Sequence, residues 1–310
     1  MVKESLRAAY GKTLLQLGQA DKRIVVLDAD LAKSTQTIIF AKEISDRFID
    51  MGLAEQDMVS TAAGIALTGK IVFASSFCVF LAGRVFDQVR QSICYNNANV
   101  KLVGTHSGLG VGEDGATHQS LEDIALMRTL PNMRIIVPAD AVETAQAVQC
   151  AAAMEGPFFI RLTRGNLATV YDGGYRFALG RASVLKDGDA ITIVAIGAMV
   201  EKALQAAEAL AASGITAAVL NLSTIKPLDG ETLLRFARKT RGFVSIEDHS
   251  TRGGLGGALA EFLGQNCPRP LRIIGVEDQF GRSGTPEDLY RHFGLTADRV
   301  AAAARAILQQ

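Results

Sequence analysis

The sequence has no closely spaced cysteine pair, no excess of charge of either sign and no long apolar run. Its four cysteines, Cys78, Cys94, Cys150 and Cys267, lie far apart, which excludes a disulfide framework and a C-x-x-C zinc site and favours reduced thiols. Lys plus Arg equals Asp plus Glu, at 32 each, so no overall charge favours nucleic acid or an anionic membrane as a partner. The longest apolar stretch, residues 191–200, is too short to span a bilayer, and no signal-peptide run follows Met1. We therefore expect a cytoplasmic protein.

The sequence does contain a regular alternation of short β-branched runs with helical patterns. In the first half we expect strands at 24–27, 70–74, 100–104, 134–137 and 158–162, and helices at 55–67, 84–95, 121–130 and 142–154. In the second half we expect strands at 191–196, 217–222, 243–247 and 271–276, and helices at 200–212, 231–239, 255–263 and 297–308. This alternation predicts an α/β fold with two domains, each a mainly parallel sheet with helices on both faces. The irregular segment 165–180 separates a domain at residues 1–170 from a domain at 180–310.

The densest polar cluster is residues 105–119, which follow the expected strand 100–104. It contains four glycines, two of the four histidines (His106 and His118), and Asp114. Ligands of open parallel sheets bind beyond the carboxyl ends of strands, so this segment is a candidate site; the alternative is a solvated surface loop. No G-x-x-x-x-G-K-[ST] string occurs, which excludes a P-loop. The glycines at 253–257 do not have dinucleotide-binding spacing and favour a tightly packed turn.

Two further segments allow both a structural and a functional interpretation. Glu55 opens a helix of small and apolar residues, where an acid stabilises the helix dipole by about 0.3–1 kcal/mol. Phe77 and Phe80 stand three residues apart after a strand, a spacing typical of core packing.

Taken together, these segments resemble transketolase. Residues 52–64 resemble the segment with the thiamine-activating glutamate, and residues 86–90, 112–119, 121–123 and 128–132 resemble neighbouring parts of its site. Residues 224–229, 247–249, 253–254 and 282–284 resemble its C-terminal domain, so the similarity runs in order along the whole chain. The G-D-G string of the transketolase diphosphate-binding domain does not occur here. The resemblance thus implies the second subunit of a split transketolase, which moves a two-carbon ketol unit between phosphorylated sugars.

The resemblance also implies a cofactor, partners and residue roles. The cofactor is thiamine diphosphate, and its Mg²⁺ ligands are expected from an N-terminal subunit of roughly 270 residues that carries G-D-G, in an assembly of two copies of each subunit. Glu55 would activate the pyrimidine, Phe77 and Phe80 would stack on it, and Asp30 would lie close by. His118, also catalytic, would contact the donor carbonyl, and Asp114 a sugar hydroxyl. Ser34, His106 and Arg164 would bind the phosphate, since a guanidinium meets phosphate bidentately; the structural alternative pairs Arg164 with a local acid and leaves His106 to cap its loop.

Three alternatives stay open on the sequence. A 1-deoxyxylulose-5-phosphate synthase shares the glutamate segment, but typically has Asp-Arg where this chain has Thr105 and His106. The β-subunit of a 2-oxo-acid dehydrogenase is a half-protein of similar length without the loop at 112–119. A non-catalytic protein could keep the fold, because fold alone does not establish activity.

Overall fold

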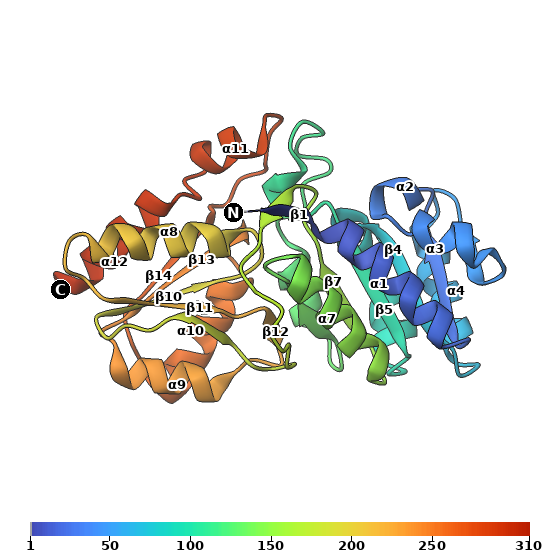
Figure 1. The fold of residues 1–310 in the computed structure, drawn as a ribbon, viewed down its shortest axis with the longest axis horizontal. Coiled ribbons are helices and arrows are strands. Elements are labelled where there is room, and N and C mark those ends of the chain that lie inside the picture. The colour runs from blue at the N-terminus through green and yellow to red at the C-terminus, as the bar shows by residue number, and fades with distance from the viewer. Residues whose placement is uncertain (1) are drawn as a thin grey trace.

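The structure is a computed structural model that describes residues 2–310, and it places two α/β domains side by side (Figure 1). The first domain is built on a seven-stranded sheet. Its strand order is β12 (Thr224–Lys226), β6 (Arg134–Ile136), β7 (Phe158–Arg161), β5 (Val100–Thr105), β4 (Ile71–Phe77), β2 (Ile24–Asp28) and β3 (Phe48–Asp50). All neighbours are parallel except β12, an antiparallel edge strand from the second half of the chain.

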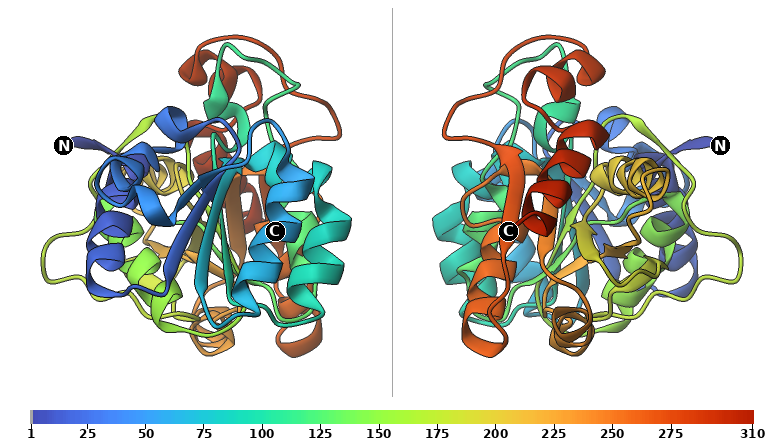
Figure 2. Two further views of the ribbon diagram at one scale, coloured as in Figure 1. Left: turned by 90° about the vertical axis from the view of Figure 1, so that its right-hand side faces the viewer. Right: turned by 90° about the vertical axis from the view of Figure 1, so that its left-hand side faces the viewer.

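Helices cover both faces of this sheet because the strand side chains alternate between two apolar layers (Figure 2). One layer packs under α1 (Leu6–Ala20), α3 (Ile38–Glu43) and α7 (Ala141–Ala153). The other packs under α4 (Glu55–Ala66), the π-helical turns η2 (Phe80–Arg84) and η3 (Val89–Cys94), and α6 (Asp123–Arg128). The remaining short elements are α2 (Ala32–Thr35), η1 (Ser45–Arg47), α5 (Phe86–Gln88), η4 (Gly108–Val111) and the antiparallel pair β1 (Lys3–Ser5) and β8 (Asn166–Ala168).

The second domain has a five-stranded sheet of order β14 (Leu271–Val276), β13 (Phe243–Ser250), β10 (Ile191–Ala195), β11 (Ala217–Asn221) and β9 (Ser183–Lys186), with only β9 antiparallel among them. Helices α8 (Met199–Ala211) and α12 (Ala297–Leu308) cover one face, and α9 (Gly230–Lys239) and α10 (Leu255–Asn266) cover the other. Helix α11 (Pro286–His292) lies beside the loop that contains η4 (Figure 1).

Two apolar clusters contain residues of both domains, and the larger one joins the two sheets. It contains Leu102 and Phe159 of the first sheet together with Val194 and Leu220 of the second. The domains therefore share a continuous core, and the edge strand β12 adds backbone hydrogen bonds between them. We expect this packing to hold the domains in a fixed relation.

The predicted fold class is confirmed, with differences at element ends. The strand expected at 70–74 is shifted and extends to Phe77, so Phe77 ends the strand instead of following it. The helix expected at 84–95 starts at Phe80 and is mostly π-helical. The pattern also missed α1 and the edge strand β12. No helix within residues 2–310 combines the length and apolarity needed to cross a membrane.

Candidate active site

The candidate site lies where four neighbouring parallel strands end. Strands β2, β4, β5 and β7 are adjacent in the sheet, and their carboxyl ends meet at one rim. The segments that follow them carry Ser34, Phe80, His106 and Arg164. Parallel pairing thus gathers on one edge residues that are far apart in the sequence, which is the position at which open α/β sheets bind ligands.

Glu55 is the first residue of α4, and it is 1% exposed. The Ser76 hydroxyl donates to Oε1 at 3.3 Å, and Arg84 Nη1 donates to Oε2 at 2.7 Å. The Arg84 side chain is 47% exposed, so the ion pair joins a buried carboxylate to a solvent-accessible guanidinium. A helix-dipole role alone needs no such burial, because dipole stabilisation also operates at exposed helix ends.

Four aromatic rings gather beside this carboxylate. Phe77 stacks on the His106 imidazole with ring centroids 3.8 Å apart, and Phe80 lies 6.1 Å from Phe77 in a parallel arrangement. The His118 ring meets the edges of both phenylalanines, at 6.3 and 5.5 Å. Arg84 lies over the Phe80 ring at 4.1 Å, which connects the aromatic group to Glu55.

The loop 105–119 is packed at its two ends and open in its middle. Residues 105–112 and 119–120 are buried, whereas Glu113, Asp114 and Thr117 are exposed. His106 has a left-handed backbone (φ 56°), rare for a residue with a side chain, and its Nδ1 lies 2.9 Å from the Thr105 hydroxyl. Burial, with the charges of Arg7 and Arg164, lowers the pKa of His106 to about 3. The imidazole is therefore neutral at pH 7 and can donate one hydrogen bond without carrying charge.

Two arginines supply the positive charge on this rim. Arg164 Nη1 donates to the Val111 carbonyl at 2.6 Å, and lies 3.6 Å from both Glu113 and Asp114. Arg7, from α1, donates to the carbonyls of Ser34 and Arg164, each at 2.8 Å. Burial and the neighbouring Arg164 lower the pKa of Arg7. If Arg164 had only a structural role, Glu113 and Asp114 would be the acids that it pairs with. Ion pairs this long and this exposed contribute little to the stability of the fold.

Asp30 and Ser34 lie on the turn after β2. The buried Asp28 carboxylate holds this turn by accepting hydrogen bonds from the Leu31 N–H and from two threonine hydroxyls. Asp30 is exposed, has φ 61°, and its N–H donates to Asp50. Among residues 2–310, no hydrogen bond or ion pair joins the Asp30 side chain to the rest of the site.

A groove of about 570 Å³ opens between the domains. Its lining includes Val79, Gln119 and Glu122 from the first domain, and Ser250 and Phe280 from the second. Ligand pockets are typically about 300–1,000 Å³, so this groove is large enough for a small molecule, although neither Glu55 nor any of the four aromatic rings lines it.

Comparisons with known proteins assign the family. Residues 3–169 match the family described as "Transketolase, pyrimidine binding domain", and residues 180–300 match "Transketolase, C-terminal domain". The chain belongs to the transketolase family.

Two relatives whose names describe them as subunits align with this chain over nearly their whole length. It is 44% identical to the 6-deoxy-6-sulfo-D-fructose transketolase subunit of a Clostridium species, over 98% of this chain and 95% of that one. It is 38% identical to an apulose-4-phosphate transketolase subunit of Phocaeicola vulgatus, over 96% of each. A solved structure described as "Split gene transketolase, inactive beta4 tetramer" superposes with a TM-score of 0.90, at 48% identity and covering 98% of each chain. The resemblance to the C-terminal half of transketolase is thereby confirmed.

The structure of this transketolase subunit adds residues that the sequence patterns missed. Arg7 lies on α1, for which the sequence does offer a signal: Ser5 is an N-cap, and the apolar Leu6, Tyr10 and Leu14 follow at four-residue spacing. The sequence predicts a helix that contains Arg84 but indicates no partner for its guanidinium. Its pairing with Glu55, 29 residues away, depends on the packing of η2 against α4, which spacing does not reveal.

Proposed function

We propose that this chain supplies the pyrimidine-activating half of a thiamine-diphosphate site in a two-subunit transketolase, which moves a two-carbon ketol unit between phosphorylated sugars. The observation that carries this proposal is the buried Glu55 carboxylate, set beside the stacked Phe77 and Phe80 and the edge-on His118. An acid and aromatic faces on one rim match the chemistry of an aminopyrimidine, which offers a ring nitrogen and a flat π-surface.

The residues present fit the pyrimidine part of the cofactor. Glu55 would hydrogen-bond a pyrimidine ring nitrogen and share its proton with that nitrogen, and Phe77 and Phe80 would hold the ring by stacking, with Asp30 near its outer side. When bound, thiamine diphosphate supplies a carbon nucleophile that also stores the electron pair of the cleaved carbon–carbon bond. Burial keeps water from competing for the Glu55 carboxylate, which strengthens its hydrogen bonds. Mg²⁺ and the diphosphate would be held by the partner subunit.

The same rim offers contacts for both ends of a sugar phosphate. His118, which is half-buried and lies edge-on to Phe77 and Phe80, would hydrogen-bond the donor carbonyl. Asp114 would accept a hydrogen bond from the sugar hydroxyl next to that carbonyl. Arg164, the neutral His106 and Ser34 would bind the phosphate, with Arg7 behind them. The two arginines would supply the positive charge that attracts the phosphate, and the neutral His106 would donate a directional hydrogen bond to it. Relatives named for a sulfonated and for a phosphorylated sugar are consistent with an anionic end group on the substrate.

A chain that holds only the pyrimidine half of the cofactor needs a second subunit for the diphosphate half. The names of both relatives describe them as subunits, and this chain aligns with nearly all of each. We infer a cytoplasmic heterotetramer with two copies of this chain and two of an N-terminal subunit carrying G-D-G.

Reconstitution tests this function. The chain is mixed with the G-D-G subunit, thiamine diphosphate and Mg²⁺, and a phosphorylated ketose donor is offered with an aldose phosphate acceptor. The proposal predicts an aldose shortened by two carbons and a ketose lengthened by two, and neither product from either subunit alone. Acyl transfer to a lipoyl acceptor would instead support the 2-oxo-acid dehydrogenase alternative, and pyruvate decarboxylation with condensation onto a triose phosphate would support the synthase alternative.

A further inference from the structure

One buried carboxylate of the second domain is bonded directly to the loop that carries His106, Asp114 and His118. Asp248, near the end of β13, is 5% exposed. Its Oδ1 accepts the Leu109 N–H at 2.8 Å and its Oδ2 accepts the Gly110 N–H at 3.3 Å. The Tyr290 hydroxyl, from α11, also donates to Oδ2, at 3.1 Å. Three donors therefore converge on this carboxylate, two of them from the backbone of η4.

The loop is shaped to approach this carboxylate closely. Gly108 has φ 62°, and a Cβ there would lie within 2.5 Å of all three carboxyl atoms of Asp248. A Cβ on Gly110 would lie 2.7 Å from the Thr163 hydroxyl and 2.9 Å from that of Tyr290. Glycine at both positions permits the contact, since any side chain would push the loop away from the second domain.

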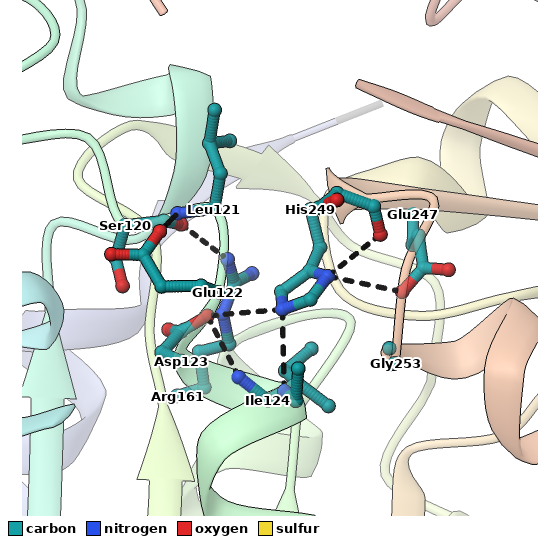
Figure 3. A network of polar contacts seen from close by, with 12 residues as sticks. Ser120, Leu121, Glu122, Asp123, Ile124, Arg161, Glu247, His249 and Gly253 are labelled. Carbon is teal, nitrogen blue, oxygen red and sulfur yellow. Dashed lines mark hydrogen bonds and ion pairs between the residues drawn. The ribbon is translucent and has the colours of Figure 1, made fainter. Parts of the chain in front are cut away.

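The backbone of Asp248 is bonded to a buried network across the domain boundary, of which Figure 3 shows Arg161, Glu247 and His249. Arg161, at the end of β7, pairs with Asp123 at 2.7 Å and donates to the Asp248 carbonyl at 2.9 Å. His249 accepts the Ala125 N–H at 3.4 Å and lies between Glu247 and Asp123. Ile124, next to Asp123, and Leu255, next to the glycines 253–254, belong to the shared apolar core. We therefore expect this network to hold Asp248 in place.

We propose that Asp248 is a positioning residue for the transketolase reaction: the second domain uses its carboxylate to hold the backbone at Leu109 and Gly110, and thereby sets His106 and His118 at the two ends of the substrate. This inference rests on the proposed function for the roles of the two histidines. It gives the second domain a part in the active site besides the packing of its core. Leu109 and Gly110 lie between the histidines in the sequence, so these two N–H groups hold the part of the loop that connects them. The ends of the loop are also held by backbone bonds of Ser107 and Gly108.

The test uses Asp248→Asn in the full chain, alone and reconstituted with the G-D-G subunit. Asn presents an NH₂ group where one carboxyl oxygen accepted a hydrogen bond, so one loop contact is lost without a change of volume. In the chain alone, amide hydrogen exchange in the peptide covering 105–112 should accelerate by about tenfold or more, while exchange in α4 stays as in wild type. In the complex, kcat/KM for a phosphorylated donor should fall by about tenfold or more, while thiamine C2 proton exchange, which depends on Glu55, should stay within about twofold.

Two further variants keep the proposal falsifiable. Tyr290→Phe removes only the third donor and should shift both readouts in the same direction by a smaller factor. Glu261→Gln breaks the 2.6 Å ion pair that joins α10 to Arg128 across the domains without touching the loop, and should leave both readouts unchanged. Unchanged loop exchange in Asp248→Asn would overturn the proposal, as would equal effects of Glu261→Gln, which would indicate general loosening of the domains. If the wild-type complex lacked transketolase activity, the proposed function would fail, while the exchange data would still show whether Asp248 holds the loop.

Discussion

The two parallel sheets end in rims of opposite character. On the first rim, the side chains of Arg84, Arg164 and Asp114 remain 39–47% exposed. On the second, Glu247, Asp248 and His249 at the end of β13 are 5% exposed or less. Glu247 caps α10 through the Leu255 and Gly256 N–H groups, and Asp248 binds the loop of the first domain. Both rims have the polar residues typical of a ligand site, and on the second rim groups within the chain already satisfy them. On the first rim Glu55 is also buried and bonded to Ser76 and Arg84, but the charged side chains around it stay partly exposed.

This difference shows why polar residues at strand ends do not by themselves identify a site. A buried carboxylate whose oxygens already accept backbone N–H groups has little capacity left for a ligand, whereas an exposed guanidinium retains free donors. The comparison therefore predicts large functional effects for changes on the first rim, and positional or stability effects for changes on the second.

The largest expected effect is that of Glu55→Gln. Removing a general acid–base group typically slows a reaction by about 10²–10⁴-fold, so thiamine C2 proton exchange in the reconstituted complex should slow by that factor. The matched control is Asp57→Asn, an exposed acid in the same first turn of α4. Proton exchange near the wild-type rate in Glu55→Gln, or equal slowing in Asp57→Asn, would contradict the activating role. Glu55 would then only stabilise the N-terminus of α4.

A smaller effect is expected for Arg164→Ala. Losing a charge-assisted hydrogen bond costs about 1.5–3 kcal/mol, so KM for a phosphorylated donor should rise by about tenfold or more. Steady-state kinetics with hydroxypyruvate, which has no phosphate, should show little change in turnover. Equal losses with both donors would show that Arg164 instead holds the loop through the Val111 carbonyl.

The smallest effect concerns the second rim and the dependence of stability on pH. Burial lowers the pKa of His249 to about 4, below the value of about 6.5 in an unfolded chain. Between these values the unfolded state binds more protons, so the contribution of His249 to stability is complete above pH 6.5 and is lost as the pH falls towards 4. Urea unfolding across this range should show a shallower loss of stability for His249→Gln than for wild type. His292→Gln, at an exposed histidine, is the control, and identical slopes for all three proteins would contradict this assignment.

The sequence was sufficient for the fold class because the buried parallel strands read as continuous apolar runs, as in Ile24–Asp28 and Ile191–Ala195. It also identified segments on the first rim, since Glu55, His106 and Arg164 each lie beside a recognisable strand or helix end. It did not identify Arg7, Arg84 or Asp248 as parts of the same region. Their contacts join residues 27 to 157 positions apart and depend on how helices and domains pack, which local periodicity does not encode.

The central claim is that the first rim is half of a thiamine-diphosphate site. Isothermal titration calorimetry with thiamine diphosphate and Mg²⁺ tests it most directly, on the isolated chain and on its complex with the G-D-G subunit. The chain alone is not expected to supply oxygen ligands for Mg²⁺, so nothing in it would bind the diphosphate end of the cofactor. We therefore predict no tight binding to the chain alone and tight, Mg²⁺-dependent binding to the complex. Tight, Mg²⁺-dependent binding to the isolated chain would contradict the half-site.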